Sequence, residues 1–249
     1  MNDFALIPRY AVLDYRVTTG LPGQITATTG MDALTRAVEA YIGGSTTKLT
    51  RRMAEEAVCR IHADLKKAYD DGSDAKARES MLRAAYCAGI AFTRSYVGYV
   101  HGVAHSLGGR YGIPHGLANA VILPYFLEEY GASCEKRLGK LARICGIAPE
   151  KADDHAASRQ FIRWVKEMNR SMEIPEKTEG IREEDIRQMA AHADKESNPL
   201  YPVPRLMDAE ELAAMYRKIA AQGDMYSRKA EKNAADAERK QEKWKSAIS

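Results

Sequence analysis

The sequence predicts an all-α protein, a helical bundle that is preceded by one isolated strand and a linker. Two observations support this fold class. From Thr29 onward, apolar residues recur at helical spacing with charged residues between them. Before Thr29 there is one alternating, β-prone run, YAVLDY at 10–15, followed by a stretch rich in Gly, Thr and Pro that is typical of a linker. Since a lone strand cannot form a sheet, the helices are expected to make the core.

Length and composition are those of an ordinary globular protein. The chain has 249 residues, of which 45% are hydrophobic and 29% charged, enough to bury a sizeable core. The 37 basic and 34 acidic residues leave a net charge of +3, which gives no indication of nucleic-acid binding. No apolar run approaches the ~20 residues of a membrane span, and the N-terminus shows no targeting pattern. We therefore expect a cytoplasmic protein with neither a membrane nor a nucleic acid as partner.

The four cysteines are expected to be reduced, mostly core thiols. They lack CxxC spacing and no secretory signal precedes them, so neither a metal site nor a disulfide framework is indicated. They are Cys59, Cys87, Cys134 and Cys145.

The first three predicted helices follow from their apolar stripes. In the helix that starts at Thr29, the spacing of Thr29 and Asp32 resembles a capping box. The GGS at 43–45 follows this helix, which indicates a C-cap and turn and not a phosphate-binding loop. The inward residues of this helix are Ala33, Leu34, Ala37, Val38, Tyr41 and Ile42. Those of the helix at 47–70 are Leu49, Met53, Val58, Ile61 and Leu65. Those of the helix at 75–93 are Met81, Leu82, Ala85, Tyr86 and Ile90.

The later helices are separated by glycine and proline. NPLYPVPR at 198–205 carries three of the nine prolines and predicts a structured loop. The residues from 223 to 249 form a charged tail. The helices between are expected at 96–109, 115–130, 135–145, 152–172, 182–194 and 208–222.

Three of the six histidines lie close together in the sequence, at His101, His105 and His115. A spacing of four places His101 and His105 on one helical face, and His115 opens the next helix after a Gly-Ile-Pro turn. Neutral imidazoles can bind a divalent transition metal. Packed core histidines bonded to carbonyls are the alternative, and the spacing alone does not decide between the two interpretations.

A second stretch adds to the histidine pattern. GMDALTRAVEAY at 30–41 and HGVAHSLGGRYGIPHGLANAVILPY at 101–125 together resemble the two signatures of the iron-containing alcohol dehydrogenases. The resemblance runs from about Tyr10 to about Ala220 and covers only the C-terminal helical half of a family member. It implies that residues 1–28 are the remnant strand and linker of a nucleotide-binding domain that is missing here. Residues 29–222 would then be a helical metal and substrate domain, ahead of the tail at 223–249.

The resemblance also implies the site. Asp32, His101 and His115 correspond to ligands of Fe²⁺ or Zn²⁺, and His105 to the active-site histidine beside substrate and nicotinamide. The remaining ligand position of the family holds Arg36, whose guanidinium has no lone pair to give and opposes a nearby cation. Asp32 and Arg36 are four residues apart, so they are expected to pair on one helical face.

The implied activity is the interconversion of a primary alcohol and an aldehyde by metal-assisted hydride transfer with NAD or NADP, with no nucleotide-binding residue identified. The absence of the nucleotide-binding half and the presence of Arg36 make two alternatives serious: a non-catalytic helical remnant, or one subunit of a split enzyme. A metal-dependent hydrolase would need a water-activating carboxylate, which is not identified. The expected partners are a small alcohol or aldehyde and either further copies in a homo-oligomer or a nucleotide-binding chain.

Overall fold

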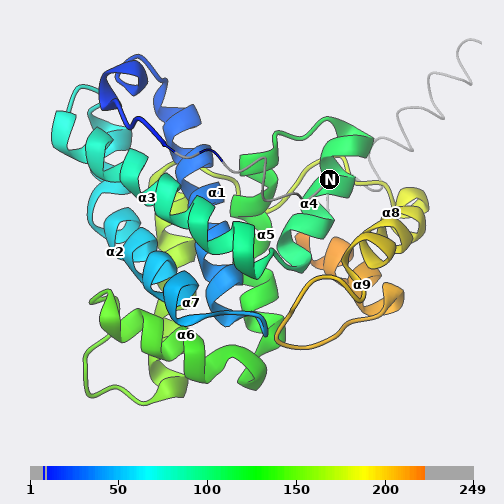
Figure 1. The fold of residues 1–249 in the computed structure, drawn as a ribbon. Helices are drawn as coiled ribbons and strands as arrows, with labels where there is room; N and C mark the ends of the chain where they lie inside the picture. Colours follow the sequence, from blue (N-terminus) through cyan, green and yellow to red (C-terminus); the bar gives the residue numbers. More distant parts are fainter. Residues whose placement is uncertain (1–7, 9, 222–249) are drawn as a thin grey trace, which may run out of the picture.

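The computed structural model describes residue 8 and residues 10–221, so the predicted tail at 223–249 lies outside the described residues. Within this part of the chain the protein has nine α-helices and no sheet, so the predicted all-α class is confirmed. Figure 1 shows how the helices are arranged. None of these helices is both long and apolar enough to cross a membrane. The helices are α1 (Gly23–Ile42), α2 (Lys48–Asp70), α3 (Ala75–Ser95), α4 (Tyr99–Tyr111), α5 (His115–Tyr130), α6 (Ala132–Ile144), α7 (Asp154–Ser171), α8 (Glu183–Ser197) and α9 (Ala209–Ile219).

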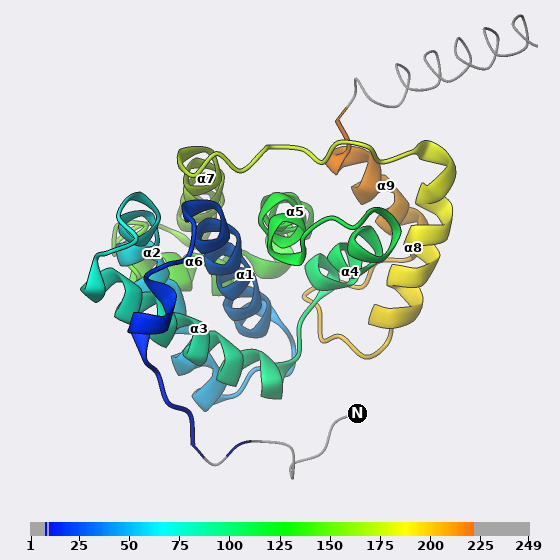
Figure 2. The same ribbon diagram turned by 90° about the horizontal axis from the view of Figure 1, so that it is seen from above.

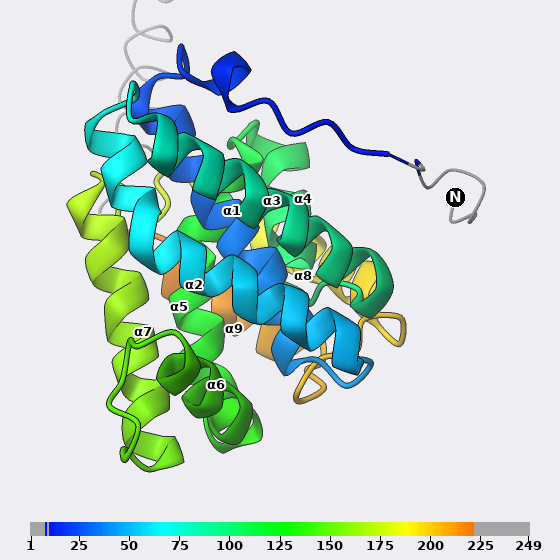
Figure 3. The same cartoon turned by 60° about the vertical axis from the view of Figure 1, so that its left-hand side comes forward.

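Helix α1 lies near the centre of the molecule. It packs against α2 and α3 on one side and against α5 on the other, and α4, α8 and α9 follow beyond α5 (Figure 2). The pair α6 and α7 lies at one end of the bundle (Figure 3). Since α1 is surrounded, it is buried on almost every side, as expected for a helix with few charged residues. The predicted stripe of α1 is confirmed.

The start of α1 differs from the prediction. The helix begins at Gly23 after Pro22, so Thr29 lies inside it and donates its hydroxyl to Ile25 O at 2.7 Å instead of capping the N-terminus. The predicted linker thus contains the first turn of the helix. Burial of Thr26 and Ala27 against neighbouring helices outweighs the turn-like composition of this stretch.

The predicted strand at 10–15 is absent. Residues 10–14 have no regular structure, and Tyr15–Thr18 form a 3-10 helix whose N-terminus is capped by Asp14. Tyr10 and Val12 are 89% and 93% exposed. The described residues contain no strand beside this segment, so its backbone groups have no ladder to join and its β-prone side chains no face to pack against.

The inward face of α3 was predicted on nearly the opposite side of the helix. Tyr86 is 43% exposed and Ala85 is exposed, whereas the buried stripe contains Ala84, Cys87, Ala88 and Ala91. Small side chains face inward because α3 packs against both α1 and α2. The larger apolar residues are therefore pushed toward the surface.

The turn after α1 matches its prediction. Gly43 ends the helix with its N–H bonded to Glu39 O at 3.0 Å, and Gly44 N–H donates to Pro202 O at 2.6 Å. The proline-rich loop at 198–205 thus packs against the C-terminus of α1. A side chain on Gly43 would place its Cβ 2.7 Å from Pro202 O, so this contact requires glycine.

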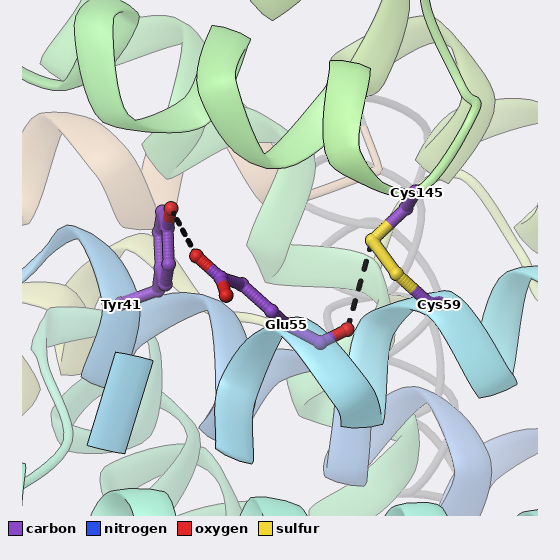
Figure 4. Close-up of a disulfide and its surroundings, with 4 residues drawn as sticks. All are labelled: Tyr41, Glu55, Cys59 and Cys145. Carbon is purple, nitrogen blue, oxygen red and sulfur yellow. Dashed lines mark hydrogen bonds between the residues drawn. A yellow bond between two sulfur atoms is a disulfide. The ribbon is translucent and has the colours of Figure 1, made fainter. Parts of the chain in front are cut away.

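A disulfide joins Cys59, in the middle of α2, to Cys145, at the end of α6 (Figure 4). The prediction of four reduced thiols is therefore wrong for this pair, whose Cα atoms are 4.6 Å apart. Cys87 and Cys134 are free and buried. The bonded cysteines are 86 residues apart, and the approach of α6 to α2 that brings them together leaves no local sequence signal.

Candidate metal centre

Three donor groups from three helices converge on one point. Asp32 comes from α1, His101 from α4, and His115 is the first residue of α5. Asp32 Oδ1 lies 3.6 Å from His101 Nε2 and 3.4 Å from His115 Nε2, and the three candidate ligand atoms lie within 4.8 Å of one another. All three residues that the sequence implied as metal ligands are thus brought together.

Glycine allows this convergence. A Cβ on Gly116, next to His115, would lie 2.5 Å from the backbone oxygen of Thr28 on α1, so only glycine permits the start of α5 to approach α1 this closely. A Cβ on Gly98, just before α4, would lie 2.7 Å from Glu39 Oε1. Both glycines therefore set the spacing of the helices that carry the donors.

Glu39 is a site residue that the sequence reasoning missed. Its carboxylate is buried, accepts the Val100 N–H at 2.9 Å through Oε1, and contacts His101 Nδ1 at 2.6 Å through Oε2. A proton held on Nδ1 leaves Nε2 of His101 facing Asp32, which is the usual arrangement behind a metal-binding histidine. Its position in the sequence could have identified it, because Glu39 follows Asp32 by seven residues and so lies on the same face of a mostly apolar helix.

The same carboxylates set the charge of His101. Burial opposes protonation of the ring, but attraction to Glu39 and hydrogen bonds to Asp32 and Glu39 outweigh it and raise the pKa of His101 to about 9. Without a cation, His101 is therefore protonated at neutral pH. A bound metal ion would have to displace this proton.

The other two donors, Asp32 and His115, have the protonation states that metal binding requires. Burial favours protonation of Asp32, but His101, Arg36 and Asn119 together lower the pKa of this carboxyl. For His115, burial lowers the pKa of the ring and attraction to Asp32 opposes the shift, with a net lowering. Asp32 is therefore ionised and His115 neutral near pH 7.

Arg36 pairs with the central carboxylate, as its spacing predicts. Its Nη2 lies 2.6 Å from Asp32 Oδ2, and its guanidinium lies over the Phe92 ring, 5.2 Å from the ring centroid. The guanidinium thus occupies the Oδ2 side of Asp32, while the histidines face Oδ1. A fixed positive charge is part of this site.

Asn119 is the second residue that the sequence reasoning missed. It follows His115 by one helical turn and is completely buried, and its Nδ2 donates to Asp32 Oδ1 at 2.7 Å. The same nitrogen lies 3.3 Å from His101 Nε2 and 3.1 Å from His115 Nε2. The amide therefore contacts every one of the three candidate ligand atoms.

His105 lies at the rim of the site. Its ring stacks on that of His115, with centroids 5.2 Å apart, and its Nδ1 contacts Glu196 Oε1 on α8 at 2.6 Å. Tyr201 donates to the same Glu196 oxygen at 2.8 Å. The side chain of His105 is 43% exposed, so this ring is open to a ligand from outside.

The donor set fits a divalent transition metal. Two imidazole nitrogens and one carboxylate oxygen are ligands that both Fe²⁺ and Zn²⁺ accept. The distances of 3.6 and 3.4 Å from Asp32 Oδ1 to the imidazole nitrogens are close to the edge of a tetrahedron with bonds of about 2.1 Å. Glu39 supports His101 from behind, and Arg36 weakens the site by repulsion without blocking Asp32 Oδ1.

The fold and these three donors define a helical domain with a candidate metal site. Residues 26–220 match the family model that is described as "Fe-containing alcohol dehydrogenase family, C-terminal". The chain belongs to the iron-containing alcohol dehydrogenase family, and the resemblance seen in the two sequence motifs is confirmed.

Alcohol dehydrogenases and a related reductase match most of this chain. Alcohol dehydrogenase 4 of Saccharomyces cerevisiae is 40% identical over 196 residues, which are 77% of this chain and 50% of the yeast protein. The solved alcohol dehydrogenase from Oenococcus oeni has a TM-score of 0.77 at 32% identity, with 83% of this chain and 54% of that chain covered. Sulfoacetaldehyde reductase from Bifidobacterium kashiwanohense, solved in complex with NAD+, has a TM-score of 0.73 at 26% identity, with 84% and 54% covered. The chain spans about half the length of these relatives.

Proposed function

We propose that this chain is the metal-binding and substrate-binding half of an oxidoreductase that interconverts a primary alcohol and an aldehyde with NAD or NADP. The observation that carries the proposal is the convergence of Asp32, His101 and His115 within 4.8 Å, in a chain that belongs to this family. The half extends over the predicted helical domain at 29–222, together with the first turns of α1.

Each residue has a role that its surroundings support. Asp32, His101 and His115 would hold Fe²⁺ or Zn²⁺, which when bound polarises a carbonyl oxygen and stabilises an alkoxide. Glu39 keeps the His101 ring oriented through the 2.6 Å contact at Nδ1. His105 faces outward beside His115 and, held by Glu196, is placed to orient the nicotinamide or to carry the alcohol proton to solvent.

The exposed face of the site supports the presence of a unit that covers it. The side chains of His105 and His115 are 43% and 38% exposed. Hydride transfer requires that water be kept away from the reacting carbon and that the nicotinamide lie against it. We therefore propose that a nucleotide-binding unit covers this face.

Two measurements on the purified chain test the proposal. Zinc or iron loading should give about one ion per chain, and Asp32→Ala should abolish it, because the carboxylate is the central donor. Addition of a nucleotide-binding domain from a relative should then give aldehyde-dependent loss of NADH absorbance. Loading that is unaffected by Asp32→Ala would contradict the site, and NADH binding without any aldehyde-dependent turnover would contradict the activity.

One observation favours a second candidate, a non-catalytic helical domain that serves only as a subunit. The 2.6 Å ion pair between Arg36 and Asp32 supplies a positive charge at the site without any metal ion. In that case the chain should fold and associate with a partner, yet bind no metal until Arg36 is replaced by histidine.

A further inference from the structure

We propose that Asn119 supplies the fourth ligand of the metal centre through its side-chain carbonyl oxygen. The inference rests on the proposed function, because it requires that Asp32, His101 and His115 hold a metal ion. It assigns to Asn119 the position that Arg36, which has no lone pair, cannot fill.

The first argument is the position of the amide. Asn119 Nδ2 lies 2.7 Å from Asp32 Oδ1, 3.3 Å from His101 Nε2 and 3.1 Å from His115 Nε2. The 3.1 and 3.3 Å contacts, with the 3.6 and 3.4 Å between Asp32 Oδ1 and the two imidazole nitrogens, are close to the edge of a tetrahedron with bonds of about 2.1 Å, whereas the 2.7 Å contact has the length of a hydrogen bond. The end of the Asn119 side chain therefore lies at the fourth corner.

The second argument is the other atom of the same amide. Asn119 Oδ1 is buried and has no hydrogen-bond partner among the described residues. An unpaired buried acceptor is costly, and such groups in native proteins usually have a purpose. Rotation of the amide by 180° exchanges its oxygen and nitrogen with almost no change of shape.

The two orientations suit two states of the site. Without a cation, the nitrogen faces inward because it can donate to the Asp32 carboxylate at 2.7 Å. With a cation, that donor would be repelled, and the unpaired oxygen takes its place as a ligand. The rotation thus exchanges a hydrogen bond for a metal bond at the same corner.

Arg36 leaves this corner free. It contacts Asp32 Oδ2 at 2.6 Å, whereas Asn119 and both histidines face Oδ1. An ion bound at Oδ1 therefore need not displace the guanidinium from its partner. Two nitrogen and two oxygen donors suit Fe²⁺, Mn²⁺ or Zn²⁺, and the second oxygen favours the harder ions.

Zinc and cobalt titrations of Asn119 variants test the proposal. Asn119→Leu has a similar volume and no ligand atom, so the Kd for Zn²⁺, measured by competition with a chromophoric chelator, should rise about 10-fold to 100-fold. Asn119→Asp keeps an oxygen at the corner and should bind at least as tightly as wild type. In Asn119→Leu the visible absorption spectrum of bound Co²⁺ should differ from that of wild type, because the amide oxygen no longer binds the ion.

The chain offers a matched control in Asn169 on α7. It is also buried, also has an Oδ1 without a partner in this part of the chain, and donates through Nδ2 to Ala120 O at 2.6 Å. Asn169→Leu should therefore leave zinc affinity unchanged.

The outcomes separate this inference from the proposed function. If Asp32→Ala abolishes zinc binding while Asn119→Leu stays within about 3-fold of wild type, Asn119 is not a ligand and the proposed function stands. If wild type binds neither zinc nor cobalt, both fail. If Asn119→Leu does not fold, the Asn119→Asp variant decides: loss of zinc binding overturns the inference, and retained or tighter binding supports it.

Discussion

Arg36 sets the charge of the candidate metal centre, since it brings a guanidinium to within 2.6 Å of the central carboxylate. Arg36→His would remove a repulsion of about 3 kcal/mol against a divalent ion, estimated for charges about 6 Å apart at an effective dielectric constant of about 40, which is roughly 100-fold in Kd. Zinc affinity should rise by at least this factor. Arg36→Gln removes the charge without adding a ligand, so its Kd should lie between those of the other two chains. Equal affinities in all three would contradict the expected repulsion.

The sequence predicted part of the candidate site. Asp32, His101, His105 and His115 were named in advance because two motifs carry them. Glu39 and Asn119 were not, although they make the shortest contacts to the candidate ligands that the described residues show apart from Arg36. Both residues are identified by their contacts with side chains on other helices, and these contacts depend on helix packing, which a local sequence pattern does not reveal.

Among the helices, the approach of α5 to α1 controls where His115 lies. Gly116→Ala would place a Cβ 2.5 Å from Thr28 O, and this contact is with backbone that cannot move aside cheaply. We expect a loss of about 1–3 kcal/mol in the free energy of unfolding, together with weaker zinc binding. Urea denaturation and a zinc titration would measure the two effects.

The control for that variant is Gly89→Ala in α3. Nothing lies within 4 Å of a Cβ at Gly89, and alanine is the better helix former by about 0.5–1 kcal/mol. This variant should therefore be slightly more stable and bind zinc normally. If both alanine variants behaved alike, the close approach at Gly116 would not be the cause.

Asp185 links α4 to the start of α8. Its carboxylate accepts from Arg110 at 2.5 Å, Tyr111 at 2.7 Å and Arg182 at 2.6 Å. The hydrogen bond from Arg110 is the largest influence on its pKa; burial opposes it, Tyr111 and Arg182 add to it, and the pKa falls to about 2. In the unfolded chain the pKa is about 3.9, so the stabilisation is complete above about pH 4 and is lost as the pH falls toward 2.

Asp185→Asn should remove this pH dependence. At pH 7 the variant should be less stable by about 1–3 kcal/mol, because charge-assisted hydrogen bonds are lost, and the difference from wild type should shrink at pH 2.5. Urea denaturation of both proteins at the two pH values would measure it. If the difference in the free energy of unfolding stayed constant with pH, the ionised form of Asp185 would not be what stabilises the folded state.

Periodicity predicted every α-helix of the described part, with ends that differ by up to six residues. It failed for the strand at 10–15, which has no neighbour, and for the face of α3. In both cases the sequence has the local apolar pattern, but the neighbouring elements determine the structure that forms. Tyr86 illustrates this, because α3 buries alanine and cysteine side chains against α1 and α2 while Tyr86 lies on the exposed side.

For the whole molecule, the disulfide between Cys59 and Cys145 closes a long stretch of chain and ties α6 to α2. Closing a loop of this length stabilises the folded state by about 4 kcal/mol in the chain-entropy account. Reduction should therefore lower Tm by about 8–15 °C. Calorimetry with and without a reductant would measure the shift.

Variants identify the bond that is responsible. Cys59→Ser should melt at the temperature of the reduced protein and no longer respond to reductant. Cys87→Ser removes a buried free thiol and should keep the full response. A reductant effect that survived in Cys59→Ser would assign it to another cause.

The same bond turns residues 59–145 into a covalent ring, which contains the histidines at 101, 105 and 115 and the turn at 71–74. A protease that cuts the backbone once at this turn would open the ring without releasing a fragment. The nicked protein would migrate as one species on a denaturing gel and separate into two only after reduction. Asp32 would then be on one fragment and the three histidines on the other, so the disulfide would link the two sides of the candidate metal centre covalently.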